Sequence, residues 1–259
     1  MKMRRWVLGG LLLGLLLAAV WQAPAHWLAR TLASASKGQL LLTDTRGTLW
    51  HGSASLVLTG GAGSRDASRL PGRLQWQLGW AAGAPVLRVG LDCCSAGLLP
   101  LRLQPGWGRL RVELPSLGGP LLRLPAGWLA GLGTPWNTLQ PSGQLRLSSR
   151  EAAFEWRSGS WQQRGLLELE LLQFGSRLST LPSLGHYRLS LTGPEQGPVQ
   201  LQLHTLEGAL QLQGSGSLDG GKLQFRGEAL AAPGQEAGLN NLLNIIGRRQ
   251  GERSVITIG

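Results

Sequence analysis

The chain has 259 residues, of which 42% are hydrophobic, 15% are charged and 39 are glycine. This apolar content argues against disorder, and low charge combined with many glycines argues against a coiled coil or a helical bundle. The formal net charge of +11 fits a nucleic acid or an anionic membrane surface as partner, or simply an arginine-rich surface.

The amino terminus predicts export. Residues 1–5 contain Lys2, Arg4 and Arg5, and residues 7–20 carry no polar side chain. A basic flank that precedes an apolar run stays in the cytoplasm. Residues 1–5 are therefore predicted to form a cytoplasmic tail, and the chain beyond the apolar run is predicted to be exported.

Two interpretations of the apolar run stay open. Its length suits the core of a cleaved signal peptide, and Ala23-Pro24-Ala25 offers a small-x-small cleavage pattern. A membrane span usually needs about 20 residues. Trp6 and Trp21, however, bracket the run as interfacial aromatics do, and a helix that continues to Trp27 gives an uncleaved anchor over residues 6–27.

From Gly38 onward the dominant hydrophobic period is two. In residues 74–80, for example, Leu and Trp alternate with Gln and Gly, and Gly, Pro and Ser clusters separate such runs. One-sided alternation is typical of antiparallel strands. We therefore predict a mainly β fold: a single amino-terminal transmembrane helix, then an extended, curved antiparallel sheet over residues 38–259 with one or two short helices.

Two segments break the period of two. Residues 121–132 show partly helical apolar spacing, with Pro125 near the start of the expected helix. Apolar residues at i, i+3, i+4 and i+7 predict a second helix over residues 239–246, which Gly247 ends. Residues 254–258 are predicted to form a closing strand.

Cys93 and Cys94 are the only cysteines, and they are adjacent. Adjacent Cα atoms lie about 3.8 Å apart, below the usual disulfide range, so a bond between these two would be strained. A redox-active or intermolecular pair is one interpretation. We prefer the interpretation that they are two small residues at the end of a strand.

No catalytic, metal or cofactor site is expected. The four histidines are scattered, and the sequence contains no P-loop, nucleophile elbow, zinc-protease motif or dinucleotide fingerprint. Arginines are spread singly along the predicted strands and do not cluster with aromatics, so no nucleic-acid partner is expected either. The basic excess then points to anionic lipid headgroups or to an acidic protein partner.

The segment G-T-L-W-H-G-S-A, which begins at Gly47, is the most distinctive in the chain. Gly47 and Gly52 indicate a tight approach or bulge between two strands, and Trp50 is expected to be a core anchor. In its context, this segment resembles the type II secretion system protein N family, also called general secretion pathway N. The context is a basic amino terminus, one apolar span, Pro24 and a strand of the kind found at residues 74–78.

The carboxyl end is similar to that family's end as well, because Leu239-Asn240-Asn241-Leu242-Leu243 leads through Arg248 to a closing strand. The resemblance implies an accessory, non-enzymatic inner-membrane component of the machine that moves folded proteins across the outer membrane of Gram-negative bacteria. Its partners would be other secretion subunits and inner-membrane lipids. The resemblance favours the uncleaved anchor over residues 6–27, with residues 38–259 as a periplasmic domain. Gly47, Thr48, Trp50 and Gly52 carry over as signature positions with a structural role.

Two other functions compete with this interpretation. A curved sheet with one apolar face can form a groove that shields acyl chains, which would make the chain a membrane-anchored lipid-binding or lipid-transfer protein. The aromatic residues expected on that face, which would equally suit a closed core, are Trp50, Trp76, Trp80, Phe154 and Trp156. A cleaved periplasmic chaperone or an outer-membrane-associated factor is the third hypothesis.

Overall fold

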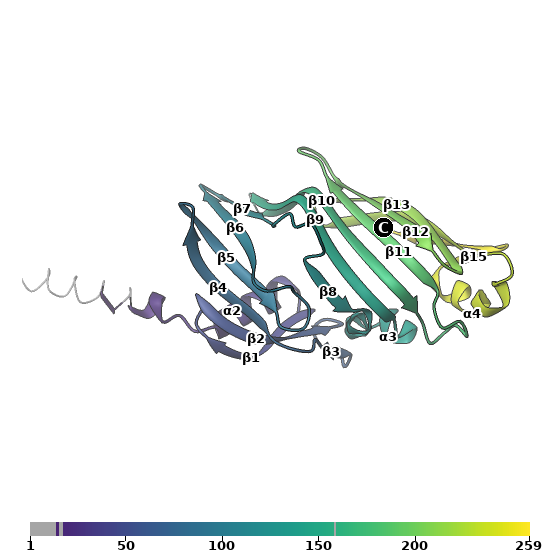
Figure 1. The fold of residues 1–259 in the computed structure, drawn as a ribbon, viewed down its shortest axis with the longest axis horizontal. Coiled ribbons are helices and arrows are strands. Elements are labelled where there is room, and N and C mark those ends of the chain that lie inside the picture. Colours follow the sequence, from purple (N-terminus) through teal and green to yellow (C-terminus); the bar gives the residue numbers. More distant parts are fainter. Residues whose placement is uncertain (1–13, 16–17, 158) are drawn as a thin grey trace, which may run out of the picture.

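The computed structural model describes residues 14–15, 18–157 and 159–259, and these form a mainly β protein. Sixteen strands make one sheet, ordered β1-β2-β4-β5-β6-β7-β9-β10-β11-β12-β13-β14-β16-β15, with β3 beside β2 and β8 beside β9. Chain neighbours are therefore mostly sheet neighbours (Figure 1), and every pairing is antiparallel, as the period of two predicted. The strands are β1 Leu40–Gly47, β2 His51–Thr59, β3 Ala67–Arg69, β4 Leu74–Ala81, β5 Ala84–Leu91, β6 Leu99–Gly106, β7 Arg109–Glu113, β8 Leu122–Pro125, β9 Ser142–Arg157, β10 Ser160–Gly175, β11 Gly185–Gly193, β12 Val199–Glu207, β13 Leu210–Asp219, β14 Lys222–Ala231, β15 Arg248–Gln250 and β16 Arg253–Ile258.

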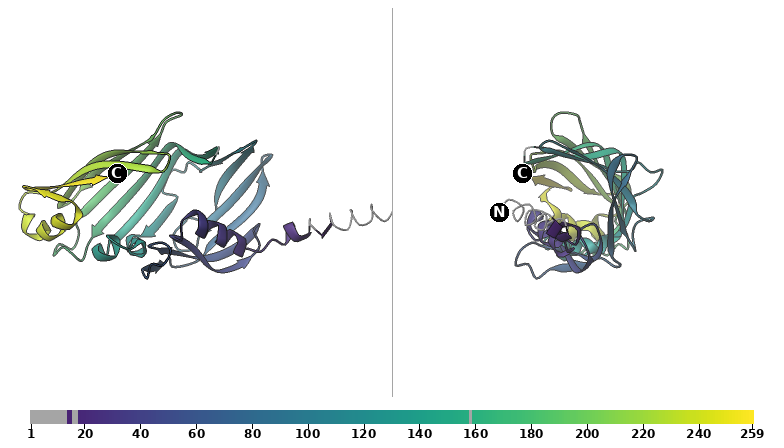
Figure 2. Two further views of the ribbon diagram at one scale, coloured as in Figure 1. Left: turned by 180° about the vertical axis from the view of Figure 1, so that it is seen from behind. Right: turned by 90° about the vertical axis from the view of Figure 1, so that its left-hand side faces the viewer.

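The register places apolar residues on one face of the sheet and charged residues on the other. Leu169 of β10 lies opposite Leu147 of β9 and Leu189 of β11. The next residue, Glu170, lies opposite Arg188, with which it forms an ion pair of 2.7 Å. Seen end-on, the sheet curls around the helices (Figure 2), so its apolar face is the concave one.

The helices cover parts of the concave face. They are α2 His26–Ala35, the 3-10 helix η1 Ala126–Leu132, α3 Trp136–Leu139 and α4 Glu236–Ile246. The prediction of a helix ended by Gly247 is confirmed, because α4 buries Leu239, Leu242 and Leu243 in a cluster with Leu184 and Tyr187. The closing strand is also confirmed as β16.

The helix predicted over residues 121–132 was only partly right. Its first residues form β8, which pairs with β9, and Pro125 keeps an extended backbone with ψ of 130°. The helical part begins only at Ala126, as a tighter 3-10 turn, and ends at Gly133. Pairing with a neighbouring strand outweighed the local helical spacing.

The fold begins earlier than Gly38. Helical residues 18–21 end at Trp21, and α2 starts at His26 after a break that contains Pro24. Leu28 and Leu32 of α2 then pack against a cluster that includes Trp76. Residues 6–13 and 16–17 of the predicted span over residues 6–27 lie outside the described residues, and within the described ranges no helix is long and apolar enough to cross a bilayer.

Candidate interaction surface

The signature segment forms the tight connection between β1 and β2. Gly47 has φ of +85°, a conformation that suits glycine, and it pairs with Gly52 across the turn. Inside the turn the backbone N–H of Thr48 donates to the carbonyl of His51 at 2.9 Å. The N–H of His51 donates in return to Oγ1 of Thr48 at 3.2 Å. Three of the four signature positions therefore shape the backbone of one hairpin, and the fourth, Trp50, extends from it.

Trp76, and not Trp50, is the core anchor of this region. Trp76 lies opposite Gly52 in the pairing of β2 with β4, and only 3% of its surface is exposed. Its indole N–H donates to the carbonyls of Thr48 at 3.2 Å and Leu49 at 3.1 Å. Trp50, which was expected to be the core anchor, is only half-buried, and its indole N–H donates to the amino-terminal segment.

The hairpin holds the segment that enters the domain from the amino terminus. The N–H of Ala25 donates to the carbonyl of Gly47 at 3.2 Å, and the N–H of Leu49 donates to the carbonyl of Ala23 at 2.8 Å. Pro24 pairs with Thr48 as an isolated bridge, and the indole N–H of Trp50 donates to the carbonyl of Val20 at 3.0 Å. We call this arrangement the hairpin clamp. Ala23 and Ala25, the small residues of the cleavage pattern, are both buried in it.

Of the five predicted apolar-face residues, Trp50 lies outside the strands, and the other four share the concave face but are not brought together. Trp76 is buried beneath α2, whereas Trp80 is 76% exposed near the end of the β4–β5 hairpin. Phe154 lies half-buried opposite Val112, and Trp156, which is 37% exposed, lies opposite Leu110 and Trp161. Trp76 is therefore a core residue, whereas Trp80, Phe154 and Trp156 face a less covered part of the concave face.

That less covered region lies between the helix-covered ends of the concave face. Half-buried aliphatic residues lie on neighbouring strands there: Leu103 lies opposite Val112 between β6 and β7, and Leu169 lies opposite Leu189 between β10 and β11. We call this stretch the apolar trough and define it by Leu101, Leu103, Val112, Leu169, Leu189 and Leu191. Neighbouring apolar side chains along a concave surface offer a binding surface for an apolar ligand.

The convex face near the β9–β10 turn carries a basic cluster around one carboxylate. Glu155 is 5% exposed, and its carboxylate accepts from Arg157 at 2.6 Å and pairs with Arg164 at 3.3 Å. The hydrogen bond from Arg157, together with the charges of the surrounding arginines, holds the pKa of Glu155 below its usual range. Arg109 lies opposite Arg157 across β7 and β9, so positive charge exceeds negative charge here.

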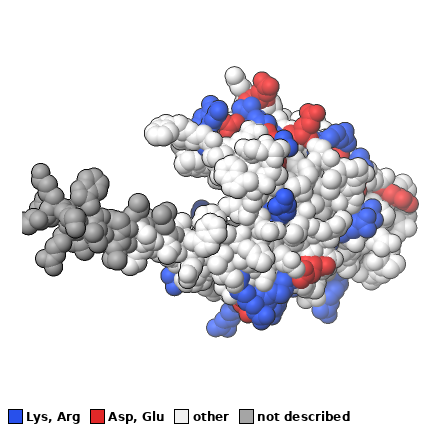
Figure 3. Space-filling model, turned by 60° about the vertical axis from the view of Figure 1, so that its left-hand side comes forward, with Lys and Arg blue, Asp and Glu red and all other residues white. Residues whose placement is uncertain are grey.

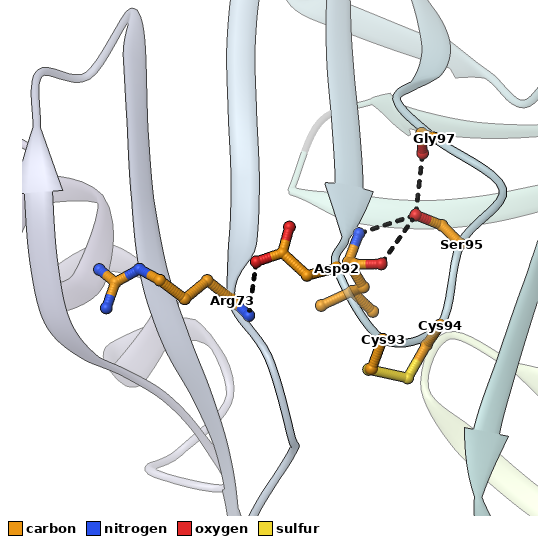
Figure 4. Close-up of a disulfide and its surroundings, with 7 residues drawn as sticks. Arg73, Asp92, Cys93, Cys94, Ser95 and Gly97 are labelled. Atoms are coloured by element: carbon orange, nitrogen blue, oxygen red, sulfur yellow. Dashed lines mark hydrogen bonds between the residues drawn. A yellow bond between two sulfur atoms is a disulfide. The ribbon is translucent and has the colours of Figure 1, made fainter.

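Cys93 and Cys94 form a disulfide, with Cα atoms 3.7 Å apart, in the loop between β5 and β6 (Figure 4). The preferred interpretation, two small residues at the end of a strand, agrees with their place just after β5, but it did not include the bond between them. Ser95 fixes the same loop because its hydroxyl accepts from the N–H of Leu91 at 2.8 Å and donates to the carbonyl of Gly97 at 2.8 Å. The N–H of Arg123 donates to the carbonyl of Cys94 at 2.7 Å, which ties the loop to β8.

The described residues offer little for catalysis. Within them, no group of three or more His, Cys, Asp or Glu side chains lies close enough to hold a metal ion. A hollow of about 790 Å³ between α4 and β16 is lined mainly by aliphatic residues such as Ile246 and Ile256, with Arg226 and Arg248 as its charged members. Such a lining binds apolar or anionic groups and supplies no general acid–base pair.

Sequence reasoning missed Trp107 and Trp161, both exposed at turns. The signal was present, because Trp107 stands between two glycines in Gly106-Trp107-Gly108 and Trp161 follows a Ser-Gly-Ser turn. A large apolar residue inside a turn has no core position to fill, so its exposure could have been anticipated.

Comparison with known proteins places these features in a family. A family model described as "Type II secretion system (T2SS), protein N" matches residues 38–257. The match covers β1 to β16, including the hairpin clamp's Gly47, Thr48, Trp50 and Gly52. No curated protein and no solved structure matches the chain significantly.

Proposed function

Because the chain belongs to the type II secretion system protein N family, we propose that it is an accessory inner-membrane component of that system, which supports the export of folded proteins from the periplasm across the outer membrane. The family consists of secretion-system components of the cell envelope and is not a known enzyme family. Membership implies association with other subunits of the system.

The observation that carries the finer proposal is the hairpin clamp. The most distinctive segment of the chain binds residues 20–25, directly after the apolar run, through backbone and indole hydrogen bonds. A domain that must stay at a fixed position relative to a membrane anchor needs such a connection. We assign residues 1–5 to the cytoplasm, 6–27 to a single-pass anchor region and 38–259 to the periplasm, with inner-membrane lipids as a second partner.

The protein acts in this proposal by binding and not by catalysis, without a cofactor and without nucleic acid. Within the described residues, the path of paired strands ends at β1 on one side and at β15 on the other. A free edge can accept a strand of another secretion subunit, because its backbone N–H and C=O groups are unpaired on one side.

Gene deletion tests the secretory role. Loss of the chain should reduce the amount of several folded exoproteins in the medium, and restoration of the full chain should return them. Unchanged secretion of every substrate would contradict the role. Amino-terminal sequencing of the native protein tests the anchor separately, since a mature start at His26 would exclude it.

A membrane-anchored lipid-binding or lipid-transfer protein is the second candidate, and the apolar trough favours it. Leu169, Leu189 and Leu191 lie half-buried on the concave face. Photoactivatable phospholipid, incorporated in vesicles that carry the full chain, should cross-link to these residues. A Leu189→Arg variant should lose the cross-links, because a buried charge opposes an acyl chain. Cross-links confined to residues 6–27 would exclude the trough as a lipid site.

A further inference from the structure

The exposed tryptophans of the described chain all lie at one edge of the sheet. Six tryptophans are exposed there, by fractions between 37% and 105%. Because the strands form an antiparallel meander, the turns β1–β2, β4–β5, β6–β7 and β9–β10 must fall at the same edge. These turns carry or adjoin every member of the set, which we call the tryptophan rim: Trp21, Trp27, Trp80, Trp107, Trp156 and Trp161.

Tryptophans at the opposite edge are packed instead. Trp128 of η1 is half-buried, joins the cluster around Leu70, and donates from its indole N–H to the carbonyl of Ser68 at 3.0 Å. Trp136 of α3 is half-buried against the cluster of α4. The two tryptophans at this edge are therefore packed, whereas the exposed tryptophans gather at the edge of the β1–β2 turn, where Trp76 is buried and Trp50 is half-buried.

The amino-terminal segment leaves the domain at the tryptophan rim. The hairpin clamp holds Ala23 to Ala25 at the β1–β2 turn, and Trp21 and Trp27 flank this point. Figure 1 shows the β4–β5 hairpin and the amino-terminal segment reaching the same end of the molecule. The surface is notched where the amino-terminal segment leaves, and largely uncharged side chains border this notch (Figure 3).

Tryptophan is the residue that membrane–water interfaces select, because its ring is apolar and its N–H finds partners among headgroups. Three rim residues, Trp80, Trp156 and Trp161, stand on the concave face, where Trp156 and Trp161 are cross-strand partners. Arg109 and Arg157, paired on the convex face at the same turns, place positive charge where anionic headgroups would lie.

We propose that the tryptophan rim rests in the headgroup region of the bilayer that holds the apolar run, so that the trough opens onto the membrane surface. This inference rests on the proposed anchor. Its occupant is lipid and not protein, because the rim is continuous with the apolar segment and repeats one interfacial residue type at successive turns.

The test uses the full chain in vesicles of phosphatidylethanolamine and phosphatidylglycerol, prepared with and without lipid brominated high in the acyl chain. Bromine quenches tryptophan fluorescence at short range. The rim variant is Trp80→Ser, Trp107→Ser and Trp161→Ser, which removes three of the six exposed tryptophans. Bromolipid quenching should fall clearly, but by less than half, in this variant, since interfacial rings lie at quencher depth and Trp6, Trp21, Trp27 and Trp156 remain.

The matched control replaces three exposed leucines away from the rim, Leu98, Leu117 and Leu206, by Ser. This variant should keep the quenching of the unchanged chain. Vesicle flotation reports the anchor independently: a chain that does not float contradicts the proposed anchor. A chain that floats while the rim variant is quenched like the unchanged chain overturns the rim inference alone. The rim variant could also lose a cross-link to another secretion subunit while its bromolipid quenching stays unchanged. This result would make the rim a protein-binding surface and would also overturn the rim inference.

Discussion

The indole ring of Trp76 occupies the space where a side chain at Gly52 would stand. The two residues lie opposite each other in β2 and β4, and a Cβ added at Gly52 would lie 2.5 Å from the Trp76 ring and 2.6 Å from the Arg46 carbonyl. The ring in turn donates to the two carbonyls of the hairpin turn. The glycine of the signature segment therefore makes room for the ring that holds the turn.

A Gly52→Ala variant should lower the free energy of unfolding by about 1–3 kcal/mol, because backbone and ring leave the new methyl group no space. Gly118→Ala is the matched control, since a Cβ there would have no neighbour within 4 Å. Denaturant unfolding of both variants checks the expectation. Equal stability of the two would contradict the steric role of Gly52.

A Trp50→Phe variant should loosen the amino-terminal segment and leave the sheet nearly unchanged. The substitution removes the indole N–H that donates to the carbonyl of Val20 at 3.0 Å. One hydrogen bond of this kind contributes about 0.5–1.5 kcal/mol. Hydrogen exchange at the amides of Gln22, Ala23 and Ala25 should become faster. Trp161→Phe, a substitution at an exposed position near the start of β10, should leave this exchange unchanged. Equal hydrogen-exchange protection in the two variants would show that Trp50 does not stabilise the hairpin clamp.

The regular part of the fold was predictable because one-sided burial imposes a period of two along each strand. The helix α4 was predictable for the same kind of reason, since Leu239, Leu242 and Leu243 face one core. The strand at residues 122–125 was not predictable, because β8 forms by pairing with β9, and the local sequence does not reveal this partner. The helix α2 was not predicted, because the predicted span ended at Trp27 and the predicted sheet domain began at residue 38.

The candidate site was predictable as a location but not as a set of roles. Gly47 and Gly52 marked a tight connection, which is a backbone property that glycine reveals. Trp76 is the core anchor in place of Trp50 because the curled sheet covers the ring of Trp76. The pattern of apolar residues does not show which of these two rings is covered. The Cys93–Cys94 bond was not expected because the Cα atoms of adjacent residues lie closer together than in most disulfides. That usual range does not apply to a bond between adjacent residues.

Glu155 should make stability depend on pH in the acidic range. Its pKa is lowered in the folded chain from an ordinary value of 4.5. The ionised carboxylate therefore contributes its full stabilisation above that value and loses it as pH falls through the lowered pKa. Glu155→Gln should be less stable than the unchanged chain at neutral pH, and the difference should shrink on acidification. Unfolding curves across this range check the sign, and a constant difference would contradict it.

The loop at Cys93 and Cys94 should depend more on Ser95 than on the disulfide. A bond between adjacent residues closes the shortest loop that a chain offers, so the chain-entropy relation assigns it only about 1 kcal/mol. Ser95 hydrogen-bonds to the backbone of both Leu91 and Gly97, and loss of each such bond costs about 0.5–1.5 kcal/mol. Ser95→Ala should therefore destabilise the chain at least as much as Cys93→Ala with Cys94→Ala, as measured by denaturant unfolding. A larger loss in the cysteine variant, reproduced by reducing the unchanged chain, would show that the covalent bond dominates the loop.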